Sequence, residues 1–506
     1  MNVKQVVLFS FFLLSLSAGF AQRIVYSQPD RDETRRMNFE VIGKVGPNFL
    51  VYKNFSGKNY IGVYNNDMVQ TERVLHDYIP YDRLINVDFF PYANHAWMVY
   101  QYQRRNVVYC EAVQVDGMGK KASDVVHLDT THIGFGGGNR IYSAISSDDR
   151  NNIMLFKINS RNKELYQITT LLFNKDLALQ KRSQFPLAMK DRDDFLDKFN
   201  VDNEGDLVFT RFTRNNNDNL VQTQLMWKPA AADTITIIPV PHEGMFLDEP
   251  HIKVDNANKR YFLTSFYYKQ RRGNIEGFYF FNWDKTTGNP VMQNAVALSD
   301  ELRNEARGEA SVKTAFNDYF IRNIIVKRDG GFLIGAESYY TTSRFNNWNR
   351  WNYLYGMPMS TFDYYSYSPL YNSWYYRNQG WGRNQAVRHH ADNITIMSFD
   401  NGGKPEWNAV IHKGQFDDES DDRISYAMML TGSQAHFLFN QEEKRSLLLN
   451  DFTLNADGDI SRNPTLKNLD KGYEFMPKFG KQVAARTMVI PCYYRNYICF
   501  AKVEFN

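Results

Sequence analysis

A β-hairpin pattern repeats along almost the whole chain and constrains its fold more than any other feature of the sequence. Each occurrence has a short alternating arm, a polar turn and a second, strongly apolar arm, as in residues 143–158, 252–268 and 324–340. Apolar and polar residues that alternate between turn signals are typical of antiparallel strands. Helical periodicity is almost absent elsewhere, so we expect an all-β protein.

The hairpins recur about every 50 residues, which is the spacing of four-stranded repeat units. A second pair of strands follows most hairpins, as in residues 219–240. Four strands in each unit match a β-propeller blade, whereas stacked solenoids use shorter or helical repeats. The apolar residues that mark the second arms are Phe49, Trp97, Ile153, Leu207, Phe262, Phe332, Phe437 and Met488.

On these hairpins the chain resembles the β-propeller superfamily over nearly all of the sequence after residue 21. The resemblance is architectural, because the sequence has no Trp-Asp dipeptide at a blade end, no sialidase-type box and one glycine cluster, at residues 136–138. It implies a single propeller domain, residues 22–506, of eight four-stranded blades, with seven as the alternative count. Residues 23–28 are expected to pair with the C-terminal strand and close the last blade, which removes an exposed edge.

Two longer steps interrupt the repeat. The step from Phe262 to Phe332 contains residues 299–316, whose helix formers predict a helical insertion. The step from Phe332 to Phe437 contains an aromatic-rich insertion at residues 339–390. We place this insertion as a loop within the sixth blade, between ordinary strands at 331–338 and 394–399. An additional blade is the weaker alternative.

The aromatic insertion has an unusual composition. Residues 339–381 hold half of the chain's 8 tryptophans, and Asn, Ser, Gly and Arg separate the rings. Rigid rings between small polar residues are typical of recognition loops and suit stacking on sugars, whereas a compact loop packed on the propeller is the alternative. The predicted binding residues are Trp348, Trp351, Trp374, Tyr375, Tyr376, Arg377 and Trp381.

The N-terminus carries the pattern of an export signal. Lys4 precedes an apolar run at residues 6–16, and small residues follow at Gly19 and Ala21, so residues 1–21 predict a signal peptide. The run is shorter than the ~20 residues that a membrane-spanning helix needs. We therefore expect an exported protein in the periplasm, at the cell surface or secreted, which meets membranes only through partners.

Cysteine is too scarce for a disulfide scaffold, since the chain has 3. A turn centred on Arg495 and Asn496 sets Cys492 opposite Cys499 in the last hairpin. Facing Cβ atoms approach within ~5.5 Å, which is close to disulfide reach. A disulfide and a pair of packed thiols are both compatible with this register, and Cys110 is left over.

Calcium is the one cofactor that the sequence suggests. An acidic run offers hard oxygen ligands, although such runs are more often solvated loops. The turns at 202–206 and 455–459 resemble calcium loops, but the bidentate glutamate of such a loop is missing, so we expect hairpin turns. The acidic run consists of Asp417, Asp418, Glu419, Asp421 and Asp422.

Two other groups contain residue types that are common in metal and catalytic sites. His389 and His390 precede Asp392, but neighbours on a strand point to opposite faces, so we do not expect them to share a metal. Glu249 and His251 place an acid and an imidazole near a strand. The sequence places no partner carboxylate beside them.

Two classes of function remain. The near balance of 59 Lys and Arg against 56 Asp and Glu argues against a nucleic-acid surface, and no phosphate loop, zinc spacing or nucleophile elbow is present. The first class is a non-catalytic exported scaffold that binds envelope proteins or surface glycan. The alternative is a carbohydrate-active enzyme, a glycoside hydrolase or lyase with acids lining the channel. The first arms show no recurring carboxylate, which favours the scaffold.

Overall fold

The structure is a computed structural model, and most of the residues that it describes lie in β-strands. It contains the short helices α2 (Asp300–Glu305) and η3 (Pro477–Phe479). No helix of the described residues is long and apolar enough to span a bilayer. The all-β prediction is confirmed. The described residues are 23–29, 37–80, 83–133, 141–160, 165–189, 194–214, 219–307, 316–343, 350, 354, 387–418, 420–443, 446–463 and 472–505.

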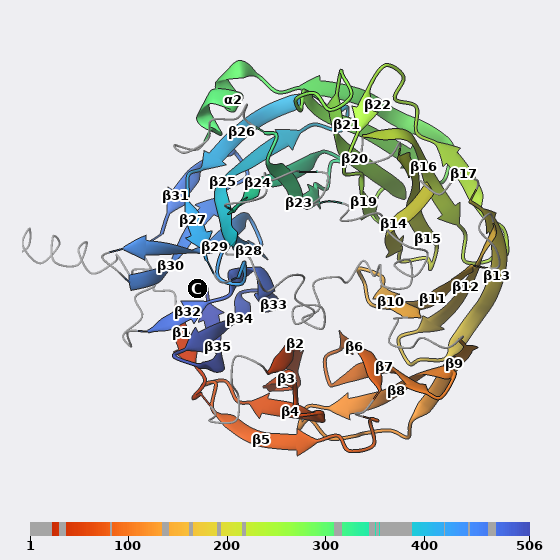
Figure 1. Cartoon of the computed structure of the whole chain (residues 1–506), viewed down its shortest axis with the longest axis vertical. Coiled ribbons are helices and arrows are strands. Elements are labelled where there is room, and N and C mark those ends of the chain that lie inside the picture. The colour runs from red at the N-terminus through yellow and green to blue at the C-terminus, as the bar shows by residue number, and fades with distance from the viewer. Residues whose placement is uncertain are drawn as a thin grey trace, which may run out of the picture.

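Antiparallel sheets stand side by side around a ring (Figure 1). Within the described residues, four of the sheets have four strands each in chain order. They are β2 (Asn38–Val45), β3 (Asn48–Phe55), β4 (Lys58–Tyr64), β5 (Gln70–Leu75); β6 (Leu84–Pro91), β7 (His95–Arg104), β8 (Val107–Asp116), β9 (Val126–His132); β10 (Tyr142–Ser146), β11 (Asn152–Ser160), β12 (Leu165–Asn174), β13 (Leu179–Ala188); and β28 (Tyr426–Thr431), β29 (Gln434–Glu443), β30 (Ser446–Leu454), β31 (Ile460–Arg462).

The other described sheets are larger because short strands join them. The nine-stranded sheet contains β14 (Asp194–Val201), β15 (Leu207–Arg214), β16 (Leu220–Lys228), β17 (Thr236–Pro239), β18 (Phe246–Leu247), β19 (His251–Asp255), β20 (Arg260–Tyr268), β21 (Gly277–Asp284) and β22 (Asn289–Ala297). One five-stranded sheet contains β23 (Tyr319–Val326), β24 (Phe332–Ser343), β25 (Val387–Phe399), β26 (Pro405–Ile411) and β27 (Gln415–Asp417). The other contains β1 (Arg23–Tyr26), β32 (Tyr473–Phe475), β33 (Lys481–Ala484), β34 (Thr487–Tyr494) and β35 (Tyr497–Glu504).

Neighbouring sheets pack face to face, which explains why the second arm of each hairpin is so apolar. In β20, for example, all residues after Arg260 are buried. Phe262 packs toward Phe332 of the next sheet, while Leu263 belongs to a cluster with β14 to β16. A strand that is covered on both faces needs apolar residues at successive positions rather than at alternate ones. The hydrophobic core is therefore divided among the contacts between sheets.

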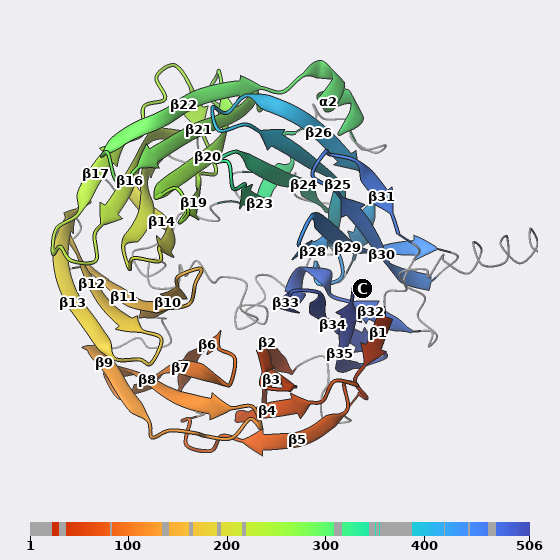
Figure 2. The ribbon, with the colours of Figure 1, turned by 180° about the vertical axis from the view of Figure 1, so that it is seen from behind.

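The two ends of the described chain lie in one sheet. Strand β1 pairs antiparallel with β35, and Ile24 lies opposite Val503. Beyond the strand, the backbone N–H of Ser27 donates to the carbonyl of Phe500 at 2.9 Å. Figure 2 shows β1 beside β35 from behind. The C-terminal strand therefore has a hydrogen-bonded neighbour on each side.

The structure corrects the limits of the strands around the aromatic insertion. Strands at 331–338 and 394–399 were expected, but β24 continues to Ser343 and β25 starts at Val387. Stacking of Tyr340 on His390, with ring centroids 4.5 Å apart, supports this longer pairing. Helix α2 lies in the other insertion, where Ser299 caps its N-terminus and Leu302 is buried.

Removing β1 should destabilise the protein. A chain that lacks residues 1–28 loses the outer ladder on β35, which we expect to lower the free energy of unfolding by on the order of 3 kcal/mol. The matched control is a chain that starts at Arg23 and keeps β1. Thermal unfolding of both chains checks this expectation. Equal melting temperatures would show that the pairing contributes nothing.

His76 should make stability depend on pH. Burial lowers the pKa of its imidazole to about 4, against an opposing hydrogen bond to the Gly119 carbonyl. Below about pH 6.5 the unfolded chain binds a proton at this histidine, whereas the folded chain binds it only near pH 4. As the pH is lowered from 6.5 to about 4, the free energy of unfolding should therefore fall by on the order of 3 kcal/mol. Denaturant titrations should show that the cost of His76→Gln shrinks over this range. His132→Gln, at an exposed position, is the control.

Candidate functional site

A cavity of about 650 Å³ opens where the inner strands meet, and we call it the central pocket. Strands β2, β6, β10, β14 and β19 form its wall together with η3 and β33. These strands lie on the inner side of the ring in both views (Figures 1 and 2). The pocket thus draws residues from units far apart in the sequence.

The lining of the central pocket mixes polar and apolar residues. In β2, Phe39, Glu40 and Val41 all line it, and Phe39 and Val41 also belong to a cluster shared with the C-terminal sheet. In β19, both Lys253 and Val254 line it. The pocket therefore borders the hydrophobic clusters between the sheets and also exposes charged groups of the inner strands.

Opposite charges share the wall of the pocket. Its acids are Glu40, Asp88 and Asp148, and its cations are Arg150, Lys253, Lys478 and Lys481. Lys253 Nζ lies 3.7 Å from an Asp148 oxygen, and Lys478 forms an ion pair at 2.6 Å with Asp421 outside the pocket lining. Arg150 donates to the Pro91 carbonyl at 2.7 Å, which fixes its guanidinium at the wall.

Lys481 has the most perturbed environment of these cations. Burial lowers its pKa, the charge of Glu40 opposes this effect, and Arg150 adds to it. Across the pocket, Asp88 is buried and accepts a hydrogen bond from Asn86 Nδ2 at 2.8 Å. The pocket can therefore offer a polar guest both cations and carboxylates in a partly desolvated place.

The predicted binding residues of the aromatic insertion, Trp348, Trp351, Trp374, Tyr375, Tyr376, Arg377 and Trp381, lie outside the described residues. Between the ends of β24 and β25, the structure describes Arg350 and Leu354. Arg350 is buried and its Nε lies 2.7 Å from Asp248 Oδ2. Leu354 packs against two hydrophobic clusters of the ring. Arg350 is a residue that the sequence did not single out.

The described members of the acidic run have protein partners. Asp417 pairs with Arg423 at 2.6 Å, and Asp418 pairs with Arg388 at 2.6 Å. Asp421 pairs with Lys478 at 2.6 Å, and Asp422 accepts a hydrogen bond from Tyr493 at 3.3 Å. Glu419 lies outside the described residues. Among the residues that can be described, no group of three or more His, Cys, Asp or Glu is placed to hold a metal. Calcium binding by this run stays a prediction.

His389 and His390 contact different residues. His389 Nδ1 lies 2.9 Å from the Tyr339 hydroxyl, whereas His390 Nε2 lies 3.1 Å from the Thr342 hydroxyl. Asp392 accepts a hydrogen bond from Tyr340 at 3.1 Å. These contacts therefore link the paired strands β24 and β25.

Cys492 and Cys499 are directly opposite each other in the ladder of β34 and β35, as the turn predicts. Both are buried free thiols, with their Sγ atoms 3.3 Å apart. Cys110 is also buried. The disulfide between Cys492 and Cys499 stays a prediction.

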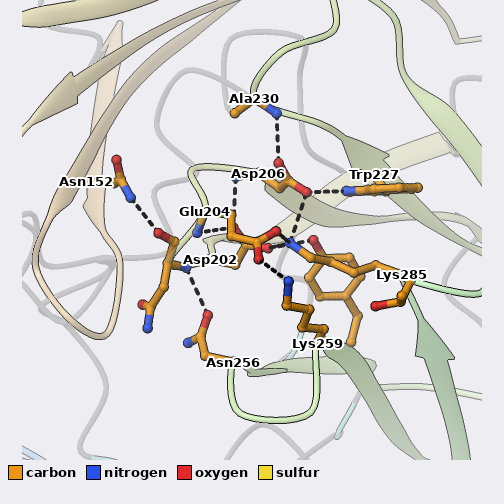
Figure 3. A network of polar contacts seen from close by, with 12 residues as sticks. Asn152, Asp202, Glu204, Asp206, Trp227, Ala230, Asn256, Lys259 and Lys285 are labelled. Carbon is orange, nitrogen blue, oxygen red and sulfur yellow. Dashed lines mark hydrogen bonds and ion pairs between the residues drawn. The ribbon is translucent and has the colours of Figure 1, made fainter.

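A lysine occupies the turn at 202–206 that resembles a calcium loop. Lys285 Nζ lies 2.5 Å from Asp202, 2.8 Å from Glu204 and 3.2 Å from Asp206 (Figure 3). Burial alone would lower the pKa of Lys285, but its hydrogen bonds to Asp202 and Glu204 outweigh this effect and raise the pKa. The ammonium group thus neutralises the acids of this turn, and this partner, far along the chain, was not visible in the sequence.

Glu249 and His251 are close together, with 2.9 Å between Glu249 Oε1 and His251 Nε2. Glu249 Oε2 lies 3.6 Å from Arg350 Nη2 of the insertion. The sequence singled out the acid and the imidazole, but not the guanidinium that joins them.

No family model and no curated protein matches the chain. Among solved structures, a prolyl endopeptidase has a TM-score of 0.42 at 8% identity, over 92% of this chain and 55% of that chain. A polysaccharide lyase described as an ulvan lyase has a TM-score of 0.37 at 9% identity, over 81% and 90%. An apocarotenoid oxygenase of Synechocystis has a TM-score of 0.33 at 8% identity, over 96% and 94%. This chain spans little more than half the length of the endopeptidase.

Replacing Lys285 should be costly. Lys285→Gln leaves Asp202 and Asp206 without their buried cation, which we expect to lower the free energy of unfolding by about 3–5 kcal/mol. Calcium should restore part of this loss, because the freed acids are hard oxygen ligands. Lys259→Gln is the control: its ion pair with Glu204 is exposed and should contribute less than about 1 kcal/mol. Melting curves with and without calcium measure these differences, and equal stability of both variants would contradict this account.

Proposed function

We propose that the protein is a carbohydrate-active enzyme that takes an acidic saccharide into the central pocket. The observation that carries this proposal is the lining of the pocket, where carboxylates and cations from the inner strands face one cavity. Polar groups at the wall suit sugar hydroxyls, and cations suit an acidic substituent. A cavity of this volume is large enough for a short saccharide.

The channel-lining acids favour an enzyme over a scaffold. The sequence shows no recurring carboxylate on the first arms, yet Glu40 of β2 and Asp88 of β6 both line the pocket. They occupy unrelated positions in their repeats, so a search for a repeated motif overlooks them. Carboxylates and a lysine of lowered pKa in one cavity are typical of sites for proton transfer.

The pocket also favours an acidic ligand over a neutral one. Its four cations outnumber its three acids. Among the described residues, neither Arg150 nor Lys481 forms an ion pair with an acid of the pocket, although the charge of Glu40 acts on Lys481. An anionic group beside them gains charge-assisted hydrogen bonds in a partly desolvated setting.

For the architecture, we propose eight blades. Dividing the nine-stranded sheet into β14 to β17 and β19 to β22 gives eight sheet units, and β1 supplies the outer strand of the last unit. The pairing of β1 with β35 supports closure by the N-terminal strand.

A binding scaffold is the second candidate function. The observation that favours it is the exposed end of the insertion stem, where the Arg388 guanidinium lies 4.5 Å from the centre of the Phe416 ring and 56% of Phe416 is exposed. Such a ring with an arginine suits a protein or glycan partner in the cell envelope. In either case we propose export of the protein by the signal at residues 1–21.

Incubation with polysaccharides tests the proposed function. The purified protein should cleave a polyuronate and leave a neutral glucan intact, with new chain ends measured as reducing sugar and elimination products measured by ultraviolet absorbance. Lys481→Gln should weaken binding of a uronate oligosaccharide about tenfold, as expected for one lost charge-assisted hydrogen bond. Lys120→Gln, on an exposed ion pair, is the control. Equal binding of acidic and neutral sugars, or of neither, would contradict the proposal.

A further inference from the structure

The hairpin of β34 and β35 holds three other strands of its sheet. Strand β1 pairs with β35, and β32 and β33 both pair with β34. Between these two short strands, the backbone N–H of Met476 donates to the Pro491 carbonyl at 2.8 Å. The same stretch of chain places Lys478 and Lys481 at the wall of the central pocket. The C-terminal hairpin therefore supports both the pairing of the two chain ends and one side of the pocket.

Two cysteines face each other within this hairpin. Cys492 and Cys499 are directly opposite in the ladder, and their Sγ atoms lie 3.3 Å apart. Because a disulfide bond is about 2.05 Å long, the two sulfur atoms need to approach by only roughly 1.3 Å to form one. Rotation about the two Cα–Cβ bonds can supply this approach while the strands stay paired. The hairpin therefore holds the two thiols in a position from which they can be joined.

The surroundings of the two sulfur atoms suit a disulfide. Both cysteines are fully buried in the contact between the last sheet and the sheet of β28 to β31. Their neighbours in this hydrophobic cluster include Ala427, Leu438 and Phe475. A disulfide carries no charge and no hydrogen-bond donor, so this apolar contact can contain it without an unsatisfied polar group.

The same burial makes the thiols of the folded protein unreactive. Burial raises the pKa of the Cys492 thiol, and its hydrogen bond with Cys499 raises this pKa further. The thiolate is the form that attacks a disulfide, and the oxidant must also reach the sulfur atom. The unfolded chain meets both conditions, whereas the packed sheet meets neither. The bond must therefore form before the last sheet packs on its neighbour.

The third cysteine is separate from this pair. Cys110 lies in β8 and belongs to the hydrophobic cluster between the sheet of β6 to β9 and the sheet of β10 to β13. A disulfide that includes Cys110 therefore requires a different fold.

We propose that Cys492 and Cys499 are oxidised to a disulfide during folding, and that this bond fixes the hairpin to which β1, β32 and β33 attach. The proposal does not depend on which ligand the central pocket accepts. It agrees with the export proposed above, because exported proteins fold in compartments where disulfides persist.

The step is an exchange with an external disulfide, for which oxidised glutathione is the probe. The thiolate of one cysteine attacks a glutathione sulfur, which forms a mixed disulfide and releases one glutathione thiolate. The thiolate of the other cysteine then attacks the cysteine sulfur of the mixed disulfide and releases the second glutathione thiolate. The two cysteines lose two protons and two electrons, and the two glutathione molecules gain them.

Folding of the protein with oxidised glutathione tests whether the bond forms. The product should be about 2 Da lighter than the reduced protein and should keep one thiol, that of Cys110, for alkylation after denaturation. Peptide mapping should find Cys492 linked to Cys499. The control Cys110→Ser should lose the same mass, whereas Cys492→Ala should form no internal bond. Three free thiols, or a link to Cys110, would overturn the proposal.

The order of folding and oxidation gives a second test. When oxidised glutathione is added to the reduced and already folded protein, the bond should form at least about tenfold more slowly than when it is added to the unfolded chain. Equal rates in the two experiments would contradict the inference that the bond forms before the sheet packs.

Melting and hydrogen exchange test what the bond does. The oxidised protein should melt about 2–5 °C above the reduced protein, because the bond limits the unfolded chain. Amide protons of β33 to β35 should exchange more slowly after oxidation, while those of β7 and β8 should exchange alike. Cys492→Ala should melt at one temperature in both buffers. Equal melting and exchange of the oxidised and reduced proteins would show that the bond does not fix the hairpin.

Discussion

The packing of each sheet against its two neighbours is the constraint on which the rest of this structure depends. The middle strands are apolar on both faces, so no sheet can stand alone in water. Phe39 of β2 and Phe500 of β35 show the result at the ends of the chain, where the first sheet packs on the last. The pairing of β1 with β35 places a hydrogen-bonded neighbour on the outer side of that last sheet.

This packing also determines the chemistry of the pocket. The inner strands of separate sheets stand side by side around the ring, so residues from several sheets border one cavity. Glu40, Asp88 and Lys253 line this cavity although they belong to three different sheets. The residues of such a site come together only when the sheets pack around the ring, so no short sequence motif predicts it.

The sequence therefore predicts local pairing well and distant partners poorly. The register of Cys492 opposite Cys499 follows from a short turn, and the β1 segment could be recognised as an unpaired strand. Neither Lys285 in the turn at 202–206 nor Arg350 beside Asp248 could be foreseen, because these partners are brought together by packing across separate units. The strands flanking the insertion were placed too short, since the polar pairing of Tyr340 with His390 has no apolar signature.

The central claim is that the inner strands form one binding site for an acidic saccharide. Crystals of the protein soaked with a uronate oligosaccharide test it most directly. We expect electron density for the sugar in the central pocket, with its carboxylate within hydrogen-bond distance of Lys253 or Lys481. A sugar bound on the aromatic insertion, with the pocket free of it, would contradict the account and favour a binding scaffold.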